Sequence, residues 1–367
     1  MLPLLHIAPP IGPLSAHPPS GAEKSLLLLA EAQARRGHSV EIVCVRGSSL
    51  PNGVRLASVD IEPGIVIPID TGVAGVIPED PDHLEREWRA FGSLVHFLAG
   101  HRDRYEVIHN HSYDSVPLFE LNSLGIPIIH TLHSPPIVAA VNTRLRAGDL
   151  PRHARYITIS KRMAELYHRE LSLEFPIVPY GIDVSSIPFR DRAEDHFLWA
   201  GRISPEKGLH TAIECVARRA GRKLRVAGPV YDEEYYRRDI LPLFNNPLVT
   251  YLGFLAIDEI YREMGRAQAL IFPIAWEEPF GMVLIEALAT GTPVIAFRRG
   301  TVDEILTHGR DSLIVANEAE LVRSLRLITT IDRRACRRTV EERFSLERTL
   351  DAIEREYSAA IAAVRTS

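Results

Sequence analysis

Two glutamates eight positions apart, Glu278 and Glu286, flank a glycine at the start of an apolar run. The run from Met282 to Ala289 predicts a buried helix that begins just after Gly281. A glycine at a helix entrance lets backbone N–H groups approach an anion, and the helix dipole adds to the attraction. Carboxylates repel anions but accept hydrogen bonds from hydroxyl groups. The segment therefore predicts a site for a ligand that carries both phosphates and sugar hydroxyls.

Arg202 and Lys207 belong to a second candidate site, which follows a predicted strand and precedes a predicted helix. In an open parallel sheet, ligands bind beyond the carboxyl ends of the strands, so both side chains are expected there. A forked guanidinium and a compact ammonium suit a diphosphate. The alternative is a surface turn capped by Ser204. Because Glu278 lies in the same half of the chain, we favour the binding site.

The first predicted strand-to-helix turn is long and proline-rich, and it ends at Gly21. A glycine at the mouth of the first helix suggests that a phosphate or a sugar approaches the backbone. The turn has no GxGxxG pattern, so a nicotinamide dinucleotide is not indicated. An ordinary helix cap formed by Ser20 and Gly21 is an alternative that the turn alone supports almost as well.

Histidines gather at the ends of two predicted strands, His109 and His111 at one and His130 and His133 at the other. This crowding raises the question of a metal site with Asp114 as a carboxylate ligand. The helical or cysteine-assisted spacings of zinc sites are missing, so a metal is the less favoured interpretation. His133 closes an apolar strand, and we expect it over the crevice as a hydrogen-bond partner for a sugar.

Asp80 and Asp82 offer paired carboxylates of the kind found in metal-dependent nucleotide-sugar sites. Flanking prolines and the lack of a preceding strand favour a plain acidic turn. The chain has neither a G-x-S-x-G elbow nor a G-x-x-x-x-G-K-[ST] loop, so hydrolase and phosphate-loop NTPase activities are not indicated.

Short apolar runs alternate with amphipathic helical stretches, which is typical of βα units around parallel sheets. First-half strands are expected at Leu2–Ala8, Ser39–Arg46, Val107–His109, Ile126–His133 and Tyr156–Ser160, with helices at Gly21–Arg36 and Lys161–Glu170. Second-half strands are expected at Phe197–Gly201, Lys223–Ala227, Val249–Leu252, Ala269–Phe272, Pro293–Phe297 and Ser312–Val315. The sequence therefore predicts an α/β protein with two consecutive sheets.

Turn residues and charges between Pro179 and Asp191 interrupt the apolar runs and mark the boundary between the halves. We expect one domain at residues 1–185 and a second at 186–345. A long helical pattern after Ser345 is expected to pack back on the first domain as residues 346–367. The segments 10–20, 64–81 and 134–146 are expected to be irregular.

The chain has 367 residues, 46% of them hydrophobic and 24% charged, with a net charge of −5. These values fit two or three globular domains and give no general attraction to nucleic acid or anionic membranes. The basic run from Arg333 to Arg338 is expected to be a solvated helix face with intrahelical ion pairs. Three distant cysteines and the lack of a signal or spanning segment predict a soluble, cytoplasmic protein.

These motifs together resemble the retaining glycosyltransferases of family 4, which have the GT-B fold of two Rossmann-like domains facing a cleft. The resemblance runs along nearly the whole chain. Its residues are Gly21-Ala22-Glu23, Arg36-Gly37-His38, Tyr180-Gly181-Ile182-Asp183, Gly201 to Gly208, and Glu278-Pro279-Phe280-Gly281 with Glu286. The segments Phe272 to Trp276 and Ala296 to Gly300 resemble in particular the subgroup typified by the avilamycin-biosynthesis transferase. The family usually has two glycines in the first turn, where this chain has Ser20 and Gly21.

The resemblance implies that the first domain binds the acceptor and the second binds a nucleotide sugar. It implies donor-binding roles for Gly21, Arg202, Lys207, Glu278, Phe280, Gly281, Met282, Val283 and Glu286. Catalytic roles are implied for His133, Glu278, Arg202 and Lys207. In this scheme Arg202 and Lys207 hold the diphosphate without a metal or other cofactor, and Glu278 holds the transferred sugar. Glu286 holds the ribose diol, which favours a UDP- or GDP-sugar, with UDP-glucose or a close relative as the expected donor.

We therefore expect a metal-independent retaining hexosyltransferase that acts on a hydroxyl acceptor, whether a small molecule, a lipid or a saccharide. Two other functions fit the same residues, namely a GT-B sugar-nucleotide epimerase and a non-catalytic nucleotide-sugar-binding protein. The sequence specifies neither the acceptor nor the oligomeric state.

Overall fold

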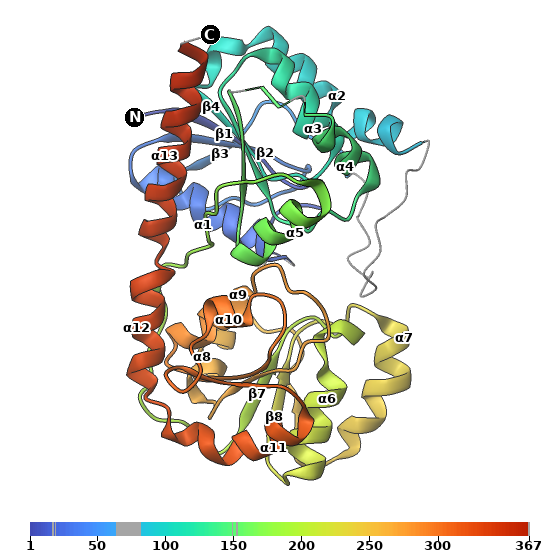
Figure 1. Cartoon of the computed structure of the whole chain (residues 1–367), viewed down its shortest axis with the longest axis vertical. Coiled ribbons are helices and arrows are strands. Elements are labelled where there is room, and N and C mark those ends of the chain that lie inside the picture. Colours follow the sequence, from blue (N-terminus) through green and yellow to red (C-terminus); the bar gives the residue numbers. More distant parts are fainter. Residues whose placement is uncertain (17, 19, 64–81, 149, 152, 366–367) are drawn as a thin grey trace. The chain divides into compact units, whose positions relative to one another are not determined.

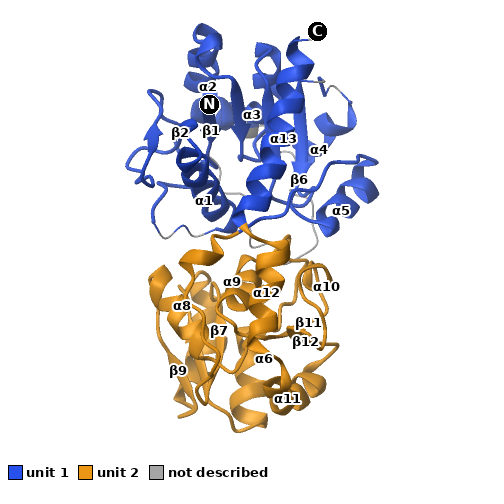
Figure 2. Ribbon diagram, turned by 90° about the vertical axis from the view of Figure 1, so that its left-hand side faces the viewer, with its two compact units in different colours: residues 1–181, 346–367 blue, residues 182–345 orange. Residues whose placement is uncertain are grey.

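The computed structural model describes the whole chain except residues 17, 19, 64–81, 149, 152 and 366–367. It divides into two compact units, unit 1 with Met1–Gly181 and Leu346–Ser367, and unit 2 with Ile182–Ser345 (Figure 2). Each unit holds a six-stranded parallel sheet. The predicted α/β class and the two Rossmann-like sheets of the GT-B fold are therefore confirmed.

The strands of unit 1 run in the order β3-β2-β1-β4-β5-β6. They are β1 Pro3–Ile7, β2 Ser39–Val43, β3 Val54–Leu56, β4 Val107–Asn110, β5 Ile128–Leu132 and β6 Ala154–Thr158. The helices are α1 Gly21–Arg35, α2 His83–Gly100, α3 Ser115–Phe119, α4 Ala139–Arg146, α5 Lys161–Leu171 and α13 Leu346–Arg365. The chain order reverses between β1 and β4, so the switch point where ligands bind in such sheets lies at their carboxyl ends.

Unit 2 repeats this topology in the order β12-β11-β10-β7-β8-β9, with its switch point between β7 and β10. Its strands are β7 Phe197–Ala200, β8 Leu224–Ala227, β9 Val249–Tyr251, β10 Leu270–Phe272, β11 Val294–Phe297 and β12 Ser312–Val315. Its helices are α6 Leu209–Ile213, α7 Glu233–Tyr235, α8 Ile257–Arg266, α9 Met282–Ala289, α10 Val302–Ile305, α11 Glu318–Leu327 and α12 Arg333–Arg343. Strands buried on both faces explain why the sequence shows continuous apolar runs.

Each strand expected from the sequence is present, with ends that differ by a few residues at most. The boundary between the units falls after Gly181, four residues before the expected position, because Ile182 N–H donates to Phe344 of unit 2 at 3.0 Å. Residues 139–146, which we expected to be irregular, form α4. The expected irregular segment 64–81 and the residues Asp80 and Pro81 lie outside the described residues.

The C-terminal helix α13 packs on the sheet of unit 1 beside α1 (Figure 1). Leu350, Ile353 and Tyr357 bury one face of the helix in the core of this unit. At the rim, Arg36 binds three carboxylates of α13, those of Glu347, Asp351 and Glu354. No helix among the described residues is long and apolar enough to span a bilayer.

The basic run of α12 differs from its prediction, because two of its arginines are structural. Arg333 is only 9% exposed and donates to the carbonyls of Arg190, Gly265 and Ala267 at 2.7–2.9 Å. Arg337 keeps the expected ion pair with Glu341 but also donates to three backbone carbonyls. Helical spacing alone cannot show which charged side chains meet unpaired carbonyls of other elements. Burial lowers the pKa of Arg333 to about 10.

Arg333→Met is expected to lower the free energy of unfolding of unit 2 by about 3 kcal/mol, because several buried carbonyls lose their donor together. Urea denaturation followed by fluorescence of Trp199, which is buried in unit 2, measures the change. The control is Arg334→Met at the neighbouring exposed position, for which we expect a change below about 0.5 kcal/mol. Equal losses in both variants would contradict the structural role of Arg333.

Candidate functional site

The switch point of unit 2 brings the two candidate segments of the sequence together. The segment with Arg202 and Lys207 follows β7, and the segment that ends at Gly281 follows β10. β7 and β10 are neighbours in the sheet. The carboxyl ends of parallel neighbours meet at one edge, so two sites found separately in the sequence form one site.

Lys207 and Glu278 form the centre of this site. Lys207 Nζ lies 2.5 Å from Glu278 Oε2, and each side chain is about 15% exposed (15% and 14%). Trp276 Nε1–H donates to the same carboxylate oxygen at 2.7 Å, and Lys207 Nζ lies 4.8 Å from the centre of the Trp276 ring. We call Lys207, Trp276 and Glu278 the acid–lysine cluster. It places a cation and an anionic acceptor side by side, which suits a ligand with a phosphate next to hydroxyl groups.

Arg202 lies in the same β7 segment and stacks on an aromatic ring. Its guanidinium carbon is 4.5 Å from the centre of the Tyr231 ring, and Tyr231 is 40% exposed. Stacking orients a guanidinium while leaving its N–H edge available to oxygen ligands. The Lys207 end of the segment is held by its main chain, because Lys207 O accepts from Trp199 Nε1 at 3.1 Å.

Gly281 is the residue before α9 and adopts φ +85°, the left-handed region that favours glycine. The amides of Phe280 to Val283 lie at the helix entrance, where first-turn N–H groups have no acceptor within the helix. These are the predicted phosphate donors. Glu286 lies on the buried side of α9 and is 6% exposed. Burial, with the nearby charge of Glu286, raises the pKa of Tyr261.

Gly300 supports Glu278 from the loop after β11. At φ +56°, a Cβ at Gly300 would lie 2.6 Å from Glu278 N and 2.7 Å from Glu278 O. Backbone atoms cannot yield as a flexible side chain can, so only glycine allows the two loops to approach this closely. The sequence placed Gly300 only in a resemblance. Tyr231 and Trp276 were not predicted to be site residues, because the cations that they contact, Arg202 and Lys207, lie far from them in the sequence.

In unit 1, Ser20 is the N-cap of α1. Ser20 Oγ accepts from Glu23 N–H at 3.2 Å and donates to Glu23 Oε2 at 2.8 Å. Gly21 is exposed as the first residue of the helix. The capping alternative is therefore present in the structure, and a ligand contact at Gly21 stays a prediction.

His133 lies just past the carboxyl end of β5 and is half-buried, as its position in the sequence predicts. Its Nε2 lies 3.1 Å from His111 Nδ1, and its Nδ1 is hydrogen-bonded to the Tyr180 hydroxyl. Both ring nitrogens therefore have partners within the protein. Any contact of His133 with a sugar through a ring nitrogen would compete with these hydrogen bonds.

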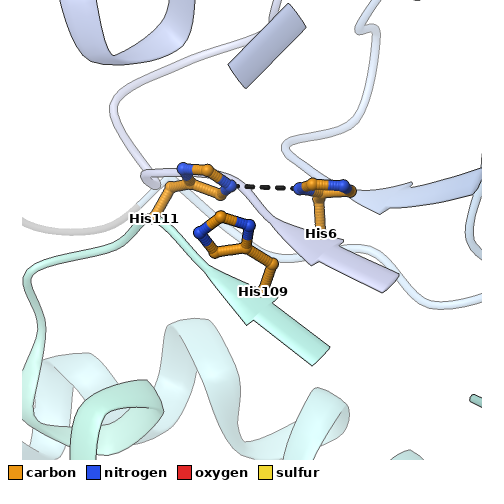
Figure 3. A group of neighbouring side chains, drawn as sticks. All are labelled: His6, His109 and His111. Carbon is orange, nitrogen blue, oxygen red and sulfur yellow. Dashed lines mark hydrogen bonds between the residues drawn. The ribbon is translucent and has the colours of Figure 1, made fainter. Parts of the chain in front are cut away.

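His6, His109 and His111 bring their ring nitrogens within 4.8 Å of one another at the switch point of unit 1 (Figure 3). His6 was not predicted to join this group, although β1 and β4 place it directly opposite His109. The rings of His109 and His111 stack, with centres 4.1 Å apart and planes inclined by 30°. Lone pairs of stacked rings run side by side and do not converge on one ion, so this geometry favours hydrogen bonding over metal binding. Asp114, the carboxylate considered with them, instead pairs with Ser112.

Five histidines of unit 1, four of them buried and His133 half-buried, have lowered pKa values with desolvation as the largest cause: His6, His109, His111, His130 and His133. The pKa is about 4 for His6 and about 3 for His133. Asp114 shows the opposite shift, because burial and then the charge of Glu87 raise its pKa to about 7. The folded unit thus holds neutral imidazoles under conditions in which the unfolded chain binds protons.

Unit 1 is expected to lose stability as the pH falls from about 6.5 toward 4. Over this range the unfolded state binds more protons than the folded state, so unfolding becomes easier by about 1.4 kcal/mol per pH unit for each net proton. Asp114 has the opposite effect on stability, because its raised pKa lets the folded state bind a proton as the pH falls. This offsets the contribution of about one of the five histidines. Hydrogen exchange corrected for intrinsic rates measures the effect, with peptides of unit 2 as the internal control. If the stability of both units depends on pH to the same extent, the lowered histidine pKa values of unit 1 are contradicted.

Two family descriptions match consecutive parts of the chain. "Glycosyltransferase Family 4" matches residues 19–186, and "Glycosyl transferases group 1" matches residues 187–343. Their junction lies within a few residues of the boundary between the two units. Together the two descriptions cover the acid–lysine cluster, the whole sheet of unit 2 and every strand of unit 1 except β1.

Relatives and solved structures agree with these matches. The D-inositol 3-phosphate glycosyltransferase of Pseudarthrobacter chlorophenolicus is 28% identical over 250 residues, which are 58% of this chain and 59% of that protein. AviGT4, a glycosyltransferase of avilamycin A biosynthesis, is 17% identical with a TM-score of 0.68 and covers 99% of this chain and 98% of its own. The Anabaena protein Alr3699/HepE, solved with UDP-glucose, is 18% identical with a TM-score of 0.70 and coverage of 98% and 100%. At these identities the solved structures show a common fold.

Proposed function

The chain belongs to the family 4 glycosyltransferases with the GT-B fold, and we propose that it moves a hexose from a nucleoside-diphosphate sugar, UDP-glucose or a close relative, to a hydroxyl acceptor. The acid–lysine cluster carries this proposal. A cation and a carboxylate 2.5 Å apart can bind the β-phosphate and the sugar hydroxyls of one donor molecule. Alr3699/HepE, a fold neighbour, was solved with UDP-glucose, which supports the choice of donor.

The reaction proposed is metal-independent and retains the configuration of the sugar. The bond between the anomeric carbon and the phosphate oxygen breaks, and the acceptor oxygen bonds to the same face of that carbon. The acceptor proton passes to the departing phosphate oxygen, so that charge and protons balance. Lys207, Arg202 and the amides at the entrance of α9 stabilise the negative charge that develops on the leaving diphosphate. With two cations in this role, we propose that no metal or other cofactor takes part.

The sugar and ribose contacts complete the proposal. Glu278 accepts hydrogen bonds from sugar hydroxyls, Glu286 accepts from the ribose diol, and His133 and Gly21 contribute from unit 1. The acceptor is a small molecule, a lipid or a saccharide. Three free, buried cysteines among the described residues support action in the reducing cytoplasm.

A thermal-shift screen of UDP-, GDP-, ADP- and dTDP-sugars with EDTA present tests the donor, because selective binding raises the melting temperature. UDP-glucose or a close UDP-sugar is expected to give the largest shift. Candidate acceptors are then added, and free UDP and the anomeric configuration of the product are measured by NMR. Conversion of the sugar without UDP release would indicate an epimerase, and binding without turnover a non-catalytic protein. Loss of binding in EDTA would contradict metal independence.

A further inference from the structure

Six polar side chains of unit 1 are joined by consecutive hydrogen bonds that run from Tyr357 in α13 to Tyr180, near the end of the first segment of the unit. In order they are Tyr357, Gln33, His6, His111, His133 and Tyr180. The Gln33 amide links Tyr357 Oη at 3.0 Å to His6 Nε2 at 2.7 Å. His6 Nδ1 lies 3.0 Å from His111 Nε2, the contact drawn in Figure 3. His111 Nδ1 then meets His133 Nε2 at 3.1 Å. We call this set the histidine chain.

The amide of Gln33 gives the histidine chain one direction. Its oxygen can only accept, so His6 must donate through Nε2–H. A neutral imidazole has one donor and one acceptor, which makes His6 Nδ1 an acceptor and His111 Nε2 a donor. The same rule makes His111 Nδ1 an acceptor, so His133 Nε2–H donates to it. His133 Nδ1 is then the acceptor for the Tyr180 hydroxyl. All three histidines therefore share the Nε2–H tautomer.

The hydrogen bonds on the other side of Gln33 agree with this orientation. The Gln33 NH₂ group donates to the Tyr357 hydroxyl, which leaves the hydroxyl proton for His109 Nδ1 at 2.8 Å. His109 Nε2–H donates to Thr131 Oγ1 at 2.7 Å. Gln33, His6 and Tyr357 are fully buried, and burial lowers the pKa of His6 to about 4. The part of the chain from Tyr357 to His111 is thus buried away from water, which would otherwise satisfy either tautomer.

We propose that Gln33, His6 and His111 are positioning residues, which fix the tautomer and the ring orientation of His133 for sugar transfer. The inference rests on the proposed function for its catalytic consequence but not for the tautomer itself. Both ring nitrogens of His133 are held in the chain, so its ring is fixed in one orientation. If every hydrogen bond of the histidine chain ran in the opposite direction, the Tyr180 hydroxyl would accept from His133 Nδ1–H instead of donating to it. Tyr180 lies one residue before Gly181, where the first segment of unit 1 ends.

The test measures the tautomers directly by ¹⁵N NMR of protein labelled in the histidine rings, with signals assigned by single histidine substitutions. In the wild-type protein, His6, His111 and His133 are each expected to carry the proton on Nε2. Gln33→Leu removes the acceptor that sets the direction, so the signal of His133, two rings away, is expected to become a mixture of tautomers. Wild-type rings that do not share the Nε2–H form would overturn the proposal, whether or not the variant folds.

Asn122→Leu is a matched control. Asn122 also offers a buried amide oxygen to a histidine Nε2, that of His130 at 3.0 Å, but it lies outside the histidine chain. This variant is expected to change His130 and leave His133 in its wild-type form. If both variants alter His133, or neither does, the histidine chain does not transmit the tautomer.

Turnover of UDP-glucose supplies the second readout. Gln33→Leu is expected to lower kcat about tenfold or more, as small misplacements of catalytic groups do, while the Kd for UDP changes less than about twofold. Asn122→Leu is expected to change neither value by more than about twofold. If Gln33→Leu shows a mixture of His133 tautomers but an unchanged kcat, the positioning role is overturned. If the wild-type enzyme transfers no sugar, the proposed function fails, and the NMR result still decides the tautomer.

Discussion

Lys207→Met is expected to lower kcat by about a hundredfold to a thousandfold, the usual cost of losing a group that stabilises developing negative charge. It should also weaken binding of UDP, since the lysine is proposed to hold the diphosphate. Glu278→Gln keeps a hydrogen-bond acceptor for Trp276 at the same position but removes the charge. We expect a tenfold to hundredfold loss of kcat/KM for UDP-glucose in this variant, because hydrogen bonds to charged groups contribute about 1.5–3 kcal/mol.

The two variants differ in how they bind the product. Glu278→Gln is expected to bind UDP as well as the wild-type enzyme or better, because Lys207 is released from its ion pair. Isothermal titration with UDP, beside kinetics with UDP-glucose, measures both effects. Lys223→Met and Glu277→Gln change exposed residues of unit 2 as controls and should leave turnover within about twofold. Loss of UDP affinity in Glu278→Gln would contradict the assignment of this carboxylate to the sugar.

Stability must be separated from activity in these variants. Lys207→Met leaves the Glu278 carboxylate, 14% exposed, without its cation, which costs about 1–3 kcal/mol of folding free energy. The double variant Lys207→Met/Glu278→Gln removes both charges and should recover part of that stability. Urea denaturation measures it. Inactivity of the double variant despite recovered stability would show that the pair acts in the reaction and not only in folding.

Gly300→Ala is expected to lower kcat about a hundredfold, because the added methyl group displaces the backbone of Glu278. Its Cβ would lie 2.6 Å from Glu278 N, a distance that real Cβ atoms do not show, so one of the two loops must move. A displacement near 1 Å of a group that binds substrate has about this effect on rate. Turnover of UDP-glucose measures the effect, with urea denaturation to follow stability.

Gly221→Ala is the matched control for Gly300. Gly221 has a similar positive φ, +62° against +56°, but a Cβ there meets nothing within 4 Å. Both variants share the cost of a left-handed alanine, about 1–2 kcal/mol, and only Gly300→Ala adds a collision. If the two variants have the same activity and stability, the contact with Glu278 does not position the site.

The fold could be predicted from the sequence because its signals are local. Buried strands appear as short apolar runs wherever they lie in the sheet, and glycines and prolines mark the turns between them. The expected Ser312–Val315 strand matches β12 in full, and the long apolar pattern after Ser345 is α13. Residues 139–146 were missed because this short helix carries little apolar periodicity of its own.

Contacts between distant segments could not be predicted in the same way. The sequence singled out Lys207 and Glu278 separately, and adjacent strands then placed them 2.5 Å apart. Arg333 was expected in solvent, but it donates to three carbonyls, those of Arg190 and of Gly265 and Ala267 at the end of α8. Helical spacing describes the neighbours within one helix and carries no information about what packs against it.

By itself, the sequence determined two parallel-sheet units and the family to which the chain belongs, and it predicted the residues that bind a nucleotide sugar. The tertiary structure alone decided that Lys207, Trp276 and Glu278 form one cluster, that Gly300 supports it, and that His6 joins the histidines of β4 and β5. The physical reason is the range of each interaction. Apolar periodicity and turn chemistry act over a few residues, whereas ion pairs, buried hydrogen bonds and close backbone contacts depend on strand order, which brings together residues far apart in the chain.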